Sequence, residues 1–234
     1  MKMLIVLTSH DQLGNTGRKT GFYLSELTHA LDVFVRAGID VDLASPAGGL
    51  PPMDGVDRKD PLNQSFLTDE VAMARLASTA RLDDVDPARY DAIYVPGGHG
   101  AMYDLPDNAR LQHLLSAVYT HGGILAAVCH GPAALVNVKL PDGRYLVADK
   151  EVSSFTDAEE VAVKLDKVMP FLLESKLTAR GGHFGKAGNF QPYAVVSGRL
   201  VTGQNPASAA SVAAEVVRLL STAPAIAPSG VDAR

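Results

Sequence analysis

An apolar run that ends abruptly at the chain's only cysteine restricts the fold more than any other stretch. Residues 122–128 read Gly-Gly-Ile-Leu-Ala-Ala-Val, and Cys129, His130 and Gly131 follow without a break. A short apolar run bounded by turn residues is typical of a strand that is buried on both faces of a parallel sheet. The stretch therefore predicts a buried strand, a sharp turn at Cys129 and the opening of a helix beyond it.

The residues around Cys129 have the layout of a nucleophile elbow. In such an elbow a strained bend holds the reactive atom above the sheet, where backbone N–H groups and a helix N-terminus stabilise an anion. Ala127 replaces the usual first glycine of this arrangement. We therefore expect Cys129 to be a nucleophile, with a pKa lowered from about 8.5 by the helix N-terminus. The alternative is a small buried structural residue, because free cysteine is among the most buried residue types.

Composition and charge exclude several classes of protein. The 234 residues suffice for one large α/β domain, and a hydrophobic content of 47% is ordinary for a globular protein. A formal net charge of −5 argues against a nucleic-acid or anionic-membrane partner. One cysteine excludes an internal disulfide and a multi-cysteine zinc site. We expect one domain over residues 1–222, followed by a flexible tail over residues 223–234.

The sequence contains no targeting signal that we recognise. The apolar run at residues 3–7 is too short for a signal peptide. No segment approaches the roughly 18 apolar residues that a membrane span needs. A lone cysteine also suits a reducing cytosol. We therefore expect a soluble, cytoplasmic protein.

Apolar runs alternate with amphipathic segments, and this alternation predicts an α/β fold with a mainly parallel central sheet and helices on both faces. Strands are expected at residues 3–7, 41–44, 90–95 and 124–128. Helices are expected at residues 24–37, 68–78, 108–121, 158–165 and 207–220, with another near 169–173. The buried face of the first helix is expected to contain Leu24, Leu27, Leu31, Phe34 and Val35.

Turn signals predict two further features. Residues 193–196 and 199–202 flank Ser197-Gly198 and are expected to form a small hairpin. Residues 144–147 and 151–154 are expected to be short strands, and the preceding Pro-Asp-Gly turn suggests that they form a second hairpin. Residues 45–65 are expected to be an extended connection and residues 181–188 a loop.

The candidate site lies beyond the carboxyl ends of the predicted parallel strands, where such sheets bind their ligands. The Gly-Gly-His-Gly run at residues 97–100 follows one of these strands, so the N–H groups of Gly98 and His130 are expected to form an oxyanion hole. A later acidic residue is expected to orient the imidazole of His130 and complete a Cys-His-acid set. From the sequence alone, the candidates are Asp157, Glu159 and Glu160.

Glu26 has two interpretations. It lies between Leu24 and Leu27 on the first predicted helix, so its carboxyl is either solvated or held at the rim of the core with a raised pKa. In the second case it exchanges a proton with the sulfur and the substrate, but spacing alone favours the first. The histidines show no HExxH or comparable metal spacing, so we expect no metal and no other cofactor. His99 is the one further histidine that merits a test.

Five motifs together resemble the ThiJ/PfpI superfamily, which has the class I glutamine amidotransferase-like fold. The nearest likeness within it is to the heat-shock chaperone/glyoxalase III group. The motifs cover residues 19–27, 96–104, 126–132, 155–160 and 198–208, and so almost the whole predicted domain. The resemblance implies a flavodoxin-like sandwich and a homodimer.

The resemblance also implies a function. It is the cofactor-independent conversion of methylglyoxal to D-lactate without glutathione, a lyase reaction of the glyoxalase III or D-lactate dehydratase type. By the same resemblance, Cys129 is the nucleophile, His130 its partner, Glu160 the third member of the triad and Glu26 a buried carboxylic acid beside the thiol. Either His130 or Glu26 would move the substrate proton.

The substrate pocket is expected to include His99, Tyr23 and Phe190. The last two stand where relatives often carry tryptophan, which puts the identity of the 2-oxoaldehyde substrate in question. Other functions also fit the sequence. These are a cysteine hydrolase (protein deglycase, amidase or peptidase) and a stress chaperone or redox sensor. A synthase-coupled amidotransferase fits less well, because His130 adjoins the cysteine.

Overall fold

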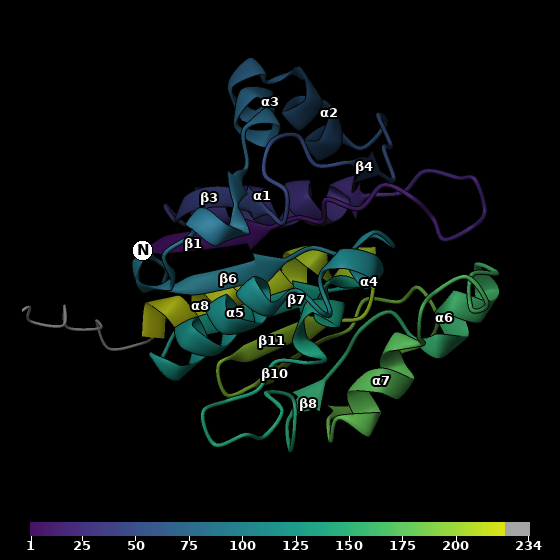
Figure 1. The fold of residues 1–234 in the computed structure, drawn as a ribbon. Coiled ribbons are helices and arrows are strands. Elements are labelled where there is room, and N and C mark those ends of the chain that lie inside the picture. Colours follow the sequence, from purple (N-terminus) through teal and green to yellow (C-terminus); the bar gives the residue numbers. More distant parts are fainter. Residues whose placement is uncertain (223–234) are drawn as a thin grey trace, which may run out of the picture.

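The computed structural model describes residues 1–222 and is built around a seven-stranded sheet with the order β10-β11-β7-β6-β1-β3-β5 (Figure 1). The strands are β1 (Lys2–Val6), β3 (Asp40–Ser45), β5 (Ala80–Arg81), β6 (Ala92–Val95), β7 (Ile124–Val128), β10 (Ala194–Ser197) and β11 (Leu200–Gly203). All neighbouring strands run parallel except β10, which forms an antiparallel hairpin with β11. The predicted mainly parallel α/β sandwich with an added hairpin is confirmed.

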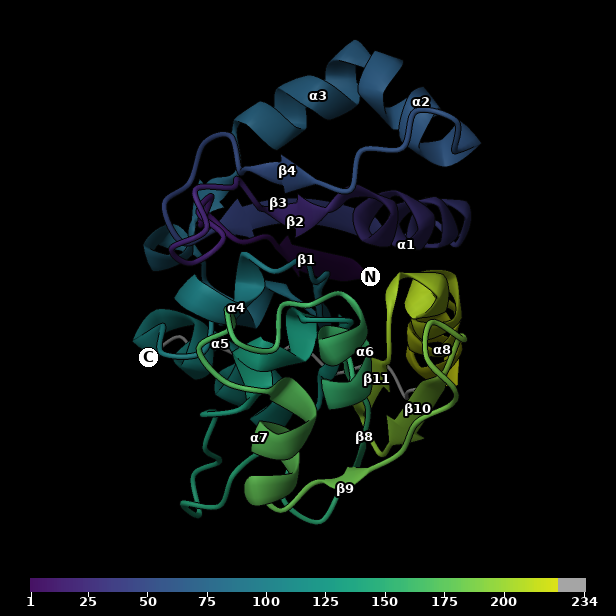
Figure 2. The same ribbon diagram turned by 90° about the vertical axis from the view of Figure 1, so that its right-hand side faces the viewer.

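Helices cover both faces of this sheet, because side chains of a buried strand alternate between its two faces. Leu4 and Val6 of β1 pack into one apolar core with α5 (Ala109–Thr120). Met3 and Ile5 pack into the other core, with α1 (Leu24–Arg36) and α8 (Ala209–Thr222). These last two helices also contact one another on their side of the sheet (Figure 2).

Short elements complete the architecture around the strand ends. The remaining α-helices are α2 (Pro61–Thr68), α3 (Glu70–Ala77), α4 (Ala101–Asp104), α6 (Asp157–Ala162) and α7 (Leu173–Ala179). Within the described part of the chain, 3₁₀ helices span Leu82–Asp84, Pro87–Arg89, Gly131–Leu135 and Pro206–Ser208. Two parallel pairs lie outside the main sheet: β2 (Phe22–Tyr23) with β4 (Met53–Asp54), and β8 (Glu151–Val152) with β9 (His183–Phe184). Figure 2 looks onto the carboxyl ends of the parallel strands, with α6 in front of them.

The hairpin predicted for residues 144–147 and 151–154 is wrong. The Pro-Asp-Gly turn does form, since the N–H of Leu140 donates to the carbonyl of Arg144 at 2.9 Å. Beyond it, however, Tyr145 makes only an isolated bridge with Lys139. β8 pairs in parallel with β9, which lies in the stretch predicted to be a loop. A turn signal locates a reversal, but contacts distant in sequence decide which strand pairs with which.

Helix boundaries also differ from the prediction. The helix predicted over residues 68–78 is present as α3 but begins two residues later, because the Asp69 carboxylate accepts the N–H groups of Val71 and Ala72 and caps α3. α2 begins inside the predicted connection and has its own cap at Asp60. The helix predicted near 169–173 starts at Leu173 as α7, and α6 ends at Ala162.

Val35 is 61% exposed although the pattern placed it on the buried face of α1. A residue next to Phe34 lies about 100° further round the helix, which carries it off the apolar stripe. The tail predicted to be flexible, residues 223–234, lies outside the described residues. Within residues 1–222, every helix is too short or too polar to cross a bilayer.

Candidate active site

β7 ends in a strained bend at Cys129. The backbone of Cys129 has φ 60°, in the left-handed region that non-glycine residues seldom occupy. Two hydrogen bonds hold it there: its N–H donates to the Gly203 carbonyl at 2.9 Å, and its own carbonyl accepts the N–H of Phe155 at 2.8 Å. Such strain persists only where surrounding structure imposes it, and it is common at functional sites. The bend predicted from the sequence is therefore present, although a five-residue 3₁₀ helix follows it.

The glycine loop after β6 presses against this bend. A Cβ on Gly131 would lie 2.1 Å from the Val95 carbonyl oxygen, and one on Gly97 would lie 2.4 Å from the His130 nitrogen. Gly98 has φ 99°, so it also needs the freedom of glycine. Because the backbones lie so close, the N–H groups of Gly98 and His130 reach the Cys129 sulfur as hydrogen-bond donors. These bonds favour the thiolate and so act to lower the pKa of Cys129. Both predicted oxyanion-hole donors are thus brought to the nucleophile.

Cys129, His130 and Glu160 form a hydrogen-bonded chain. The Cys129 Sγ lies 3.3 Å from His130 Nδ1, and His130 Nε2 lies 2.7 Å from Glu160 Oε2. Burial lowers the pKa of His130 to about 4, and the charge of His99 adds to the effect. The imidazole is therefore neutral near pH 7. With Nε2–H donated to Glu160, its Nδ1 is free to accept the thiol proton.

Glu160 contacts a second histidine. Its Oε1 lies 3.0 Å from His99 Nε2, and the two imidazole centroids are 4.2 Å apart. Burial acts to raise the pKa of Glu160, but the hydrogen bonds from His130 and His99 outweigh it and lower the pKa to about 2. The ligand atoms of these three residues lie within 4.8 Å of one another, which is compatible with a cation. Because hydrogen bonds already join these atoms, we interpret the cluster as an acid–base unit.

Glu26 is fully buried, so the solvated interpretation is wrong. Its Oε2 accepts the N–H of Gly97 at 2.5 Å, and its Oε1 has no hydrogen-bond partner among residues 1–222. Burial raises the pKa of Glu26 to about 8, against the opposing effects of the Gly97 N–H and the Cys129 thiol. The carboxyl is therefore mostly protonated at neutral pH.

The expected lowering of the Cys129 pKa is wrong in direction. Burial raises the pKa of this thiol, and ionisation of Glu26 would raise it further. The residue is only 3% exposed, and the helix that follows it is one short 3₁₀ segment with little dipole. The sulfur therefore rests as a thiol, with His130 Nδ1 as its neighbouring proton acceptor at 3.3 Å.

A cavity of about 320 Å³ opens onto the sulfur. Its lining comprises Leu13, Arg18, Tyr23, Asp54, Gly98, His99, Cys129, His130, Phe155, Val163, Leu165, Phe190 and Pro206. The predicted pocket residues His99, Tyr23 and Phe190 are all present, and Phe190 is 48% exposed. Sequence reasoning did not single out Arg18, Asp54 or Phe155, although Arg18 belongs to the loop after β1 that points to this edge of the sheet.

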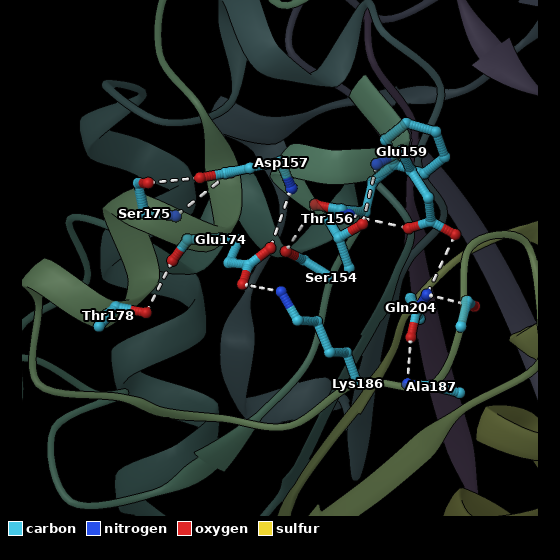
Figure 3. A network of polar contacts seen from close by, with 12 residues as sticks. Ser154, Thr156, Asp157, Glu159, Glu174, Ser175, Thr178, Lys186, Ala187 and Gln204 are labelled. Atoms are coloured by element: carbon cyan, nitrogen blue, oxygen red, sulfur yellow. Dashed lines mark hydrogen bonds and ion pairs between the residues drawn. The ribbon is translucent and has the colours of Figure 1, made fainter. Parts of the chain in front are cut away.

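Sequence reasoning also missed the role of Glu159, which is fully buried. Its Oε1 accepts from the Phe190 N–H at 2.7 Å, the Asn205 amide at 2.9 Å and the Gln204 amide at 3.1 Å. Its Oε2 accepts the N–H of Thr156 at 2.9 Å and completes a capping box for α6 (Figure 3). The Thr-x-x-Glu spacing is a recognisable signal for this cap. The short helix α6 thus places Glu160 beside His130. On the same helix, Glu159 binds the backbone N–H of Phe190 in the cavity wall.

A strained cysteine, an adjacent histidine and a carboxylate at the carboxyl ends of a parallel sheet define a class of cysteine-dependent α/β proteins. Within this class, the model of the DJ-1/PfpI family matches residues 19–219, and the chain belongs to that family. The ThiJ/PfpI resemblance seen in the sequence is thereby confirmed.

Several relatives match almost the whole chain. Glyoxalase 3 of Candida albicans is 32% identical, over 93% of this chain and 97% of its own. The glutathione-independent glyoxalase HSP31 of Saccharomyces cerevisiae is 33% identical, over 94% and 98%. The solved structure of the Rapid Encystment Protein 24 kDa of Francisella tularensis has a TM-score of 0.91 and 39% identity, over 94% of this chain and 98% of its own. The fold and its length are thus those of these proteins.

Proposed function

We propose that this protein is a glutathione-independent glyoxalase that converts a small 2-oxoaldehyde to the 2-hydroxy acid, as methylglyoxal to D-lactate. The observation that carries the proposal is the hydrogen-bonded Cys129-His130-Glu160 chain, whose sulfur faces the cavity. The names of the two yeast relatives support the choice of reaction.

The first step is attack of Cys129 on the aldehyde carbon, C1. The Sγ–C1 bond forms, the thiol proton passes to His130 Nδ1, and Glu160 stabilises the imidazolium through its contact with Nε2. The developing alkoxide accepts hydrogen bonds from the N–H groups of Gly98 and His130 and then takes the proton of the His130 imidazolium, which gives the hemithioacetal with a hydroxyl on C1. Glu26 in its protonated form carries no charge that would oppose a thiolate, and its contact with the thiol makes it a proton donor beside the sulfur.

The second step moves a proton between the two former carbonyl carbons. C1 of the hemithioacetal loses its hydrogen, C2 gains one, and a thioester of the 2-hydroxy acid results. Water then adds to the thioester, and the sulfur leaves as the thiol. C1 is oxidised by as much as C2 is reduced, so the sum is 2-oxoaldehyde plus water giving hydroxy acid. From the sequence, His130 and Glu26 are the candidates for the base.

The test is hydroxy-acid formation from methylglyoxal in the absence of glutathione. We expect the wild-type protein to form D-lactate and Cys129→Ala to lose at least about 10³-fold of its activity, because the covalent route is gone. Cys129→Ser retains the size of the side chain and serves as a packing control. A wild-type protein that forms no hydroxy acid, or an active Cys129→Ala variant, contradicts the proposal.

Hydrolysis by the same nucleophile is a second candidate, since a Cys-His-Glu unit with two N–H donors is also suited to acyl transfer. A panel of small 2-oxoaldehydes, amides and glycated amines separates the two. If amides or glycated amines turn over faster than methylglyoxal, the protein is a hydrolase such as a deglycase or amidase.

A stress chaperone is favoured by one observation: the exposed apolar side chains of Val163 and Phe190 line the cavity, and Val161 is exposed on α6. Suppression of aggregation that survives Cys129→Ala would support the chaperone. The homodimer, the cytoplasmic location and the single domain over residues 1–222 are also proposals, and sedimentation analysis tests the first of them.

A further inference from the structure

We infer that His99 is the acid–base residue that moves the substrate proton from C1 to C2, while His130 serves the sulfur. The inference rests on the proposed function and assigns the step that the sequence left open between His130 and Glu26. It makes one carboxylate, Glu160, the orienting partner of two imidazoles with separate tasks.

The two histidines make equivalent contacts with Glu160. His130 Nε2 contacts Oε2 at 2.7 Å, and His99 Nε2 contacts Oε1 at 3.0 Å. An ionised carboxylate only accepts hydrogen bonds, so each imidazole presents its Nε2–H to Glu160. In the neutral form, each ring then carries a lone pair on Nδ1. Glu160 therefore prepares two bases at once.

These two Nδ1 atoms have different surroundings. The Nδ1 of His130 lies 3.3 Å from the Cys129 sulfur, which makes it the base for the thiol. The Nδ1 of His99 makes no hydrogen bond with any group of residues 1–222, and His99 lines the cavity. A base without a protein partner, at the wall of the site, is suited to a proton on the substrate.

The other two candidates are less well placed for this step. The side chain of His130 is 1% exposed, against 20% for His99, and both of its ring nitrogens already have partners. Glu26 is fully buried and does not belong to the cavity lining. Its carboxyl is mostly protonated near pH 7, so it has little capacity to accept a proton there.

In the proposed step, His99 transfers one proton from C1 to C2. Nδ1 of His99 takes the C1 proton of the hemithioacetal, the C–H electron pair becomes the C1–C2 double bond, and the C2 carbonyl pair moves to its oxygen. Nδ1 then returns the proton to C2, while the proton of the C1 hydroxyl passes to the C2 oxygen. The thioester forms with no external oxidant or reductant. Glu160 stabilises the transient His99 cation through Nε2–H.

The experiment compares His99→Gln, His99→Ala and His130→Gln with the wild-type protein. Glutamine retains an N–H that can reach Glu160 but cannot act as a base. Two quantities are measured: methylglyoxal turnover without glutathione, and the rate of alkylation by iodoacetamide. Because Cys129 is the only cysteine, alkylation reports this thiol alone. His183→Gln is the matched control, since His183 pairs with Glu151 outside the cavity.

We expect His99→Gln to lower kcat by about 10²- to 10⁴-fold, while KM and the alkylation rate change by less than about threefold. His130→Gln lowers both turnover and alkylation. Added imidazole restores turnover to His99→Ala by about tenfold or more. With C1-deuterated methylglyoxal, the isotope effect on kcat is larger in His99→Gln than in the wild-type protein, because proton abstraction becomes slower.

Three results would overturn the inference. They are a kcat of His99→Gln within about threefold of wild type, a parallel fall of alkylation and kcat, or no rescue of a folded His99→Ala by imidazole. The parallel fall would mean that His99 acts only by supporting Cys129 and His130. A wild-type protein that makes no hydroxy acid contradicts the proposed function and this inference together, whereas an active wild type with an unaffected His99→Gln contradicts the inference alone.

Discussion

The α1 side of the site contains Glu26 and the α6 side contains Glu160, and near pH 7 the first of these buried glutamates is neutral whereas the second is ionised. Glu26 Oε2 receives the Gly97 N–H, and Oε1 has no hydrogen-bond partner within residues 1–222, so burial outweighs the effects of that N–H and of the Cys129 thiol and raises the pKa to about 8. Glu160 receives two imidazole N–H groups, which outweigh burial and lower its pKa to about 2. The number of donors, rather than burial alone, decides whether a buried carboxyl is an acid or an anion.

The comparison also separates the tasks of the two sides. Glu26 on the α1 side is a neutral carboxyl beside the thiol, and in the proposed reaction it is a proton donor that does not oppose a developing thiolate. Glu160 on the α6 side is a carboxylate that orients the imidazoles of His130 and His99, and in the proposed reaction it stabilises their cations. Each of the following experiments changes one side and leaves the other as it is.

The largest effect is expected for Glu160→Gln on the α6 side. Removing the charge releases both imidazoles from their Nε2–H tautomer, so we expect kcat to fall by about 10³-fold or more. The measurement is methylglyoxal turnover. Asp157→Asn on the same helix is the control and should stay near wild type, because within residues 1–222 the Asp157 carboxylate accepts hydrogen bonds from Ser175 alone. Turnover of Glu160→Gln near that of the control would show that the charge is not needed.

Glu26→Gln tests the protonated state on the α1 side. The folded protein binds a proton at Glu26 up to about pH 8, whereas the unfolded chain releases it near 4.5. The unfolded state therefore binds fewer protons between these values, and the contribution of Glu26 to stability is present below pH 4.5 and is lost as the pH rises to 8. Glutamine does not titrate. Wild type therefore loses stability from pH 5 to pH 8, and the variant does not. We expect the unfolding free energy of Glu26→Gln minus that of wild type to increase by a few kcal/mol over this range.

Urea unfolding at pH 5, 6.5 and 8 measures this difference. His130 is common to both proteins, so its own titration cancels in the comparison. A constant difference between the two proteins across the range would mean that Glu26 is already ionised in the folded state.

Glu159→Gln tests how the α6 side fixes the cavity wall. The substitution weakens the contacts that hold the Phe190 and Thr156 N–H groups, since an amide offers one acceptor oxygen in place of two. We expect a loss of about 1–3 kcal/mol in unfolding free energy. KM should rise more than kcat falls, because the wall moves while the triad retains its atoms. An unchanged KM together with a lowered kcat would place Glu159 in the chemistry instead.

The smallest effect is expected at Lys164, which has φ 61° just beyond α6. Lys164→Gly relieves the left-handed strain of the folded state but raises the conformational entropy of the unfolded chain. Because these effects oppose one another, we expect the unfolding free energy to change by no more than about 1 kcal/mol and turnover to stay the same. Cys129 has nearly the same φ at the end of β7, and there the strained bend positions the proposed nucleophile. A loss of turnover in Lys164→Gly would show that strain on the α6 side also serves catalysis.

Local patterns predicted much of the fold. The parallel sheet, the helices on both faces and the closing hairpin follow from apolar periodicity and turn residues, and all are present. The bend at Cys129 and the glycine loop beside it were also visible, because an elbow and a Gly-Gly run are local features. The second hairpin failed because β8 takes a partner about 30 residues away, which no turn signal encodes.

Less of the site than of the fold could be predicted from the sequence. The residues left Asp157, Glu159 and Glu160 as equal candidates, and only the resemblance selected Glu160. All three lie on one short helix, and its orientation decides that Glu160 meets His130 while Glu159 meets the Phe190 backbone. Spacing likewise favoured a solvated Glu26, since a helix position between two leucines does not reveal what packs over it.

The sequence by itself determined most strands and helices in their order along the chain and the place of the bend at Cys129, because period, turn chemistry and chain connectivity act over a few residues. The tertiary structure alone decided the ionisation of Glu26, Glu160 and the Cys129 thiol. Charge states depend on burial and on donors brought from distant segments, and those distances exist only once the chain has folded.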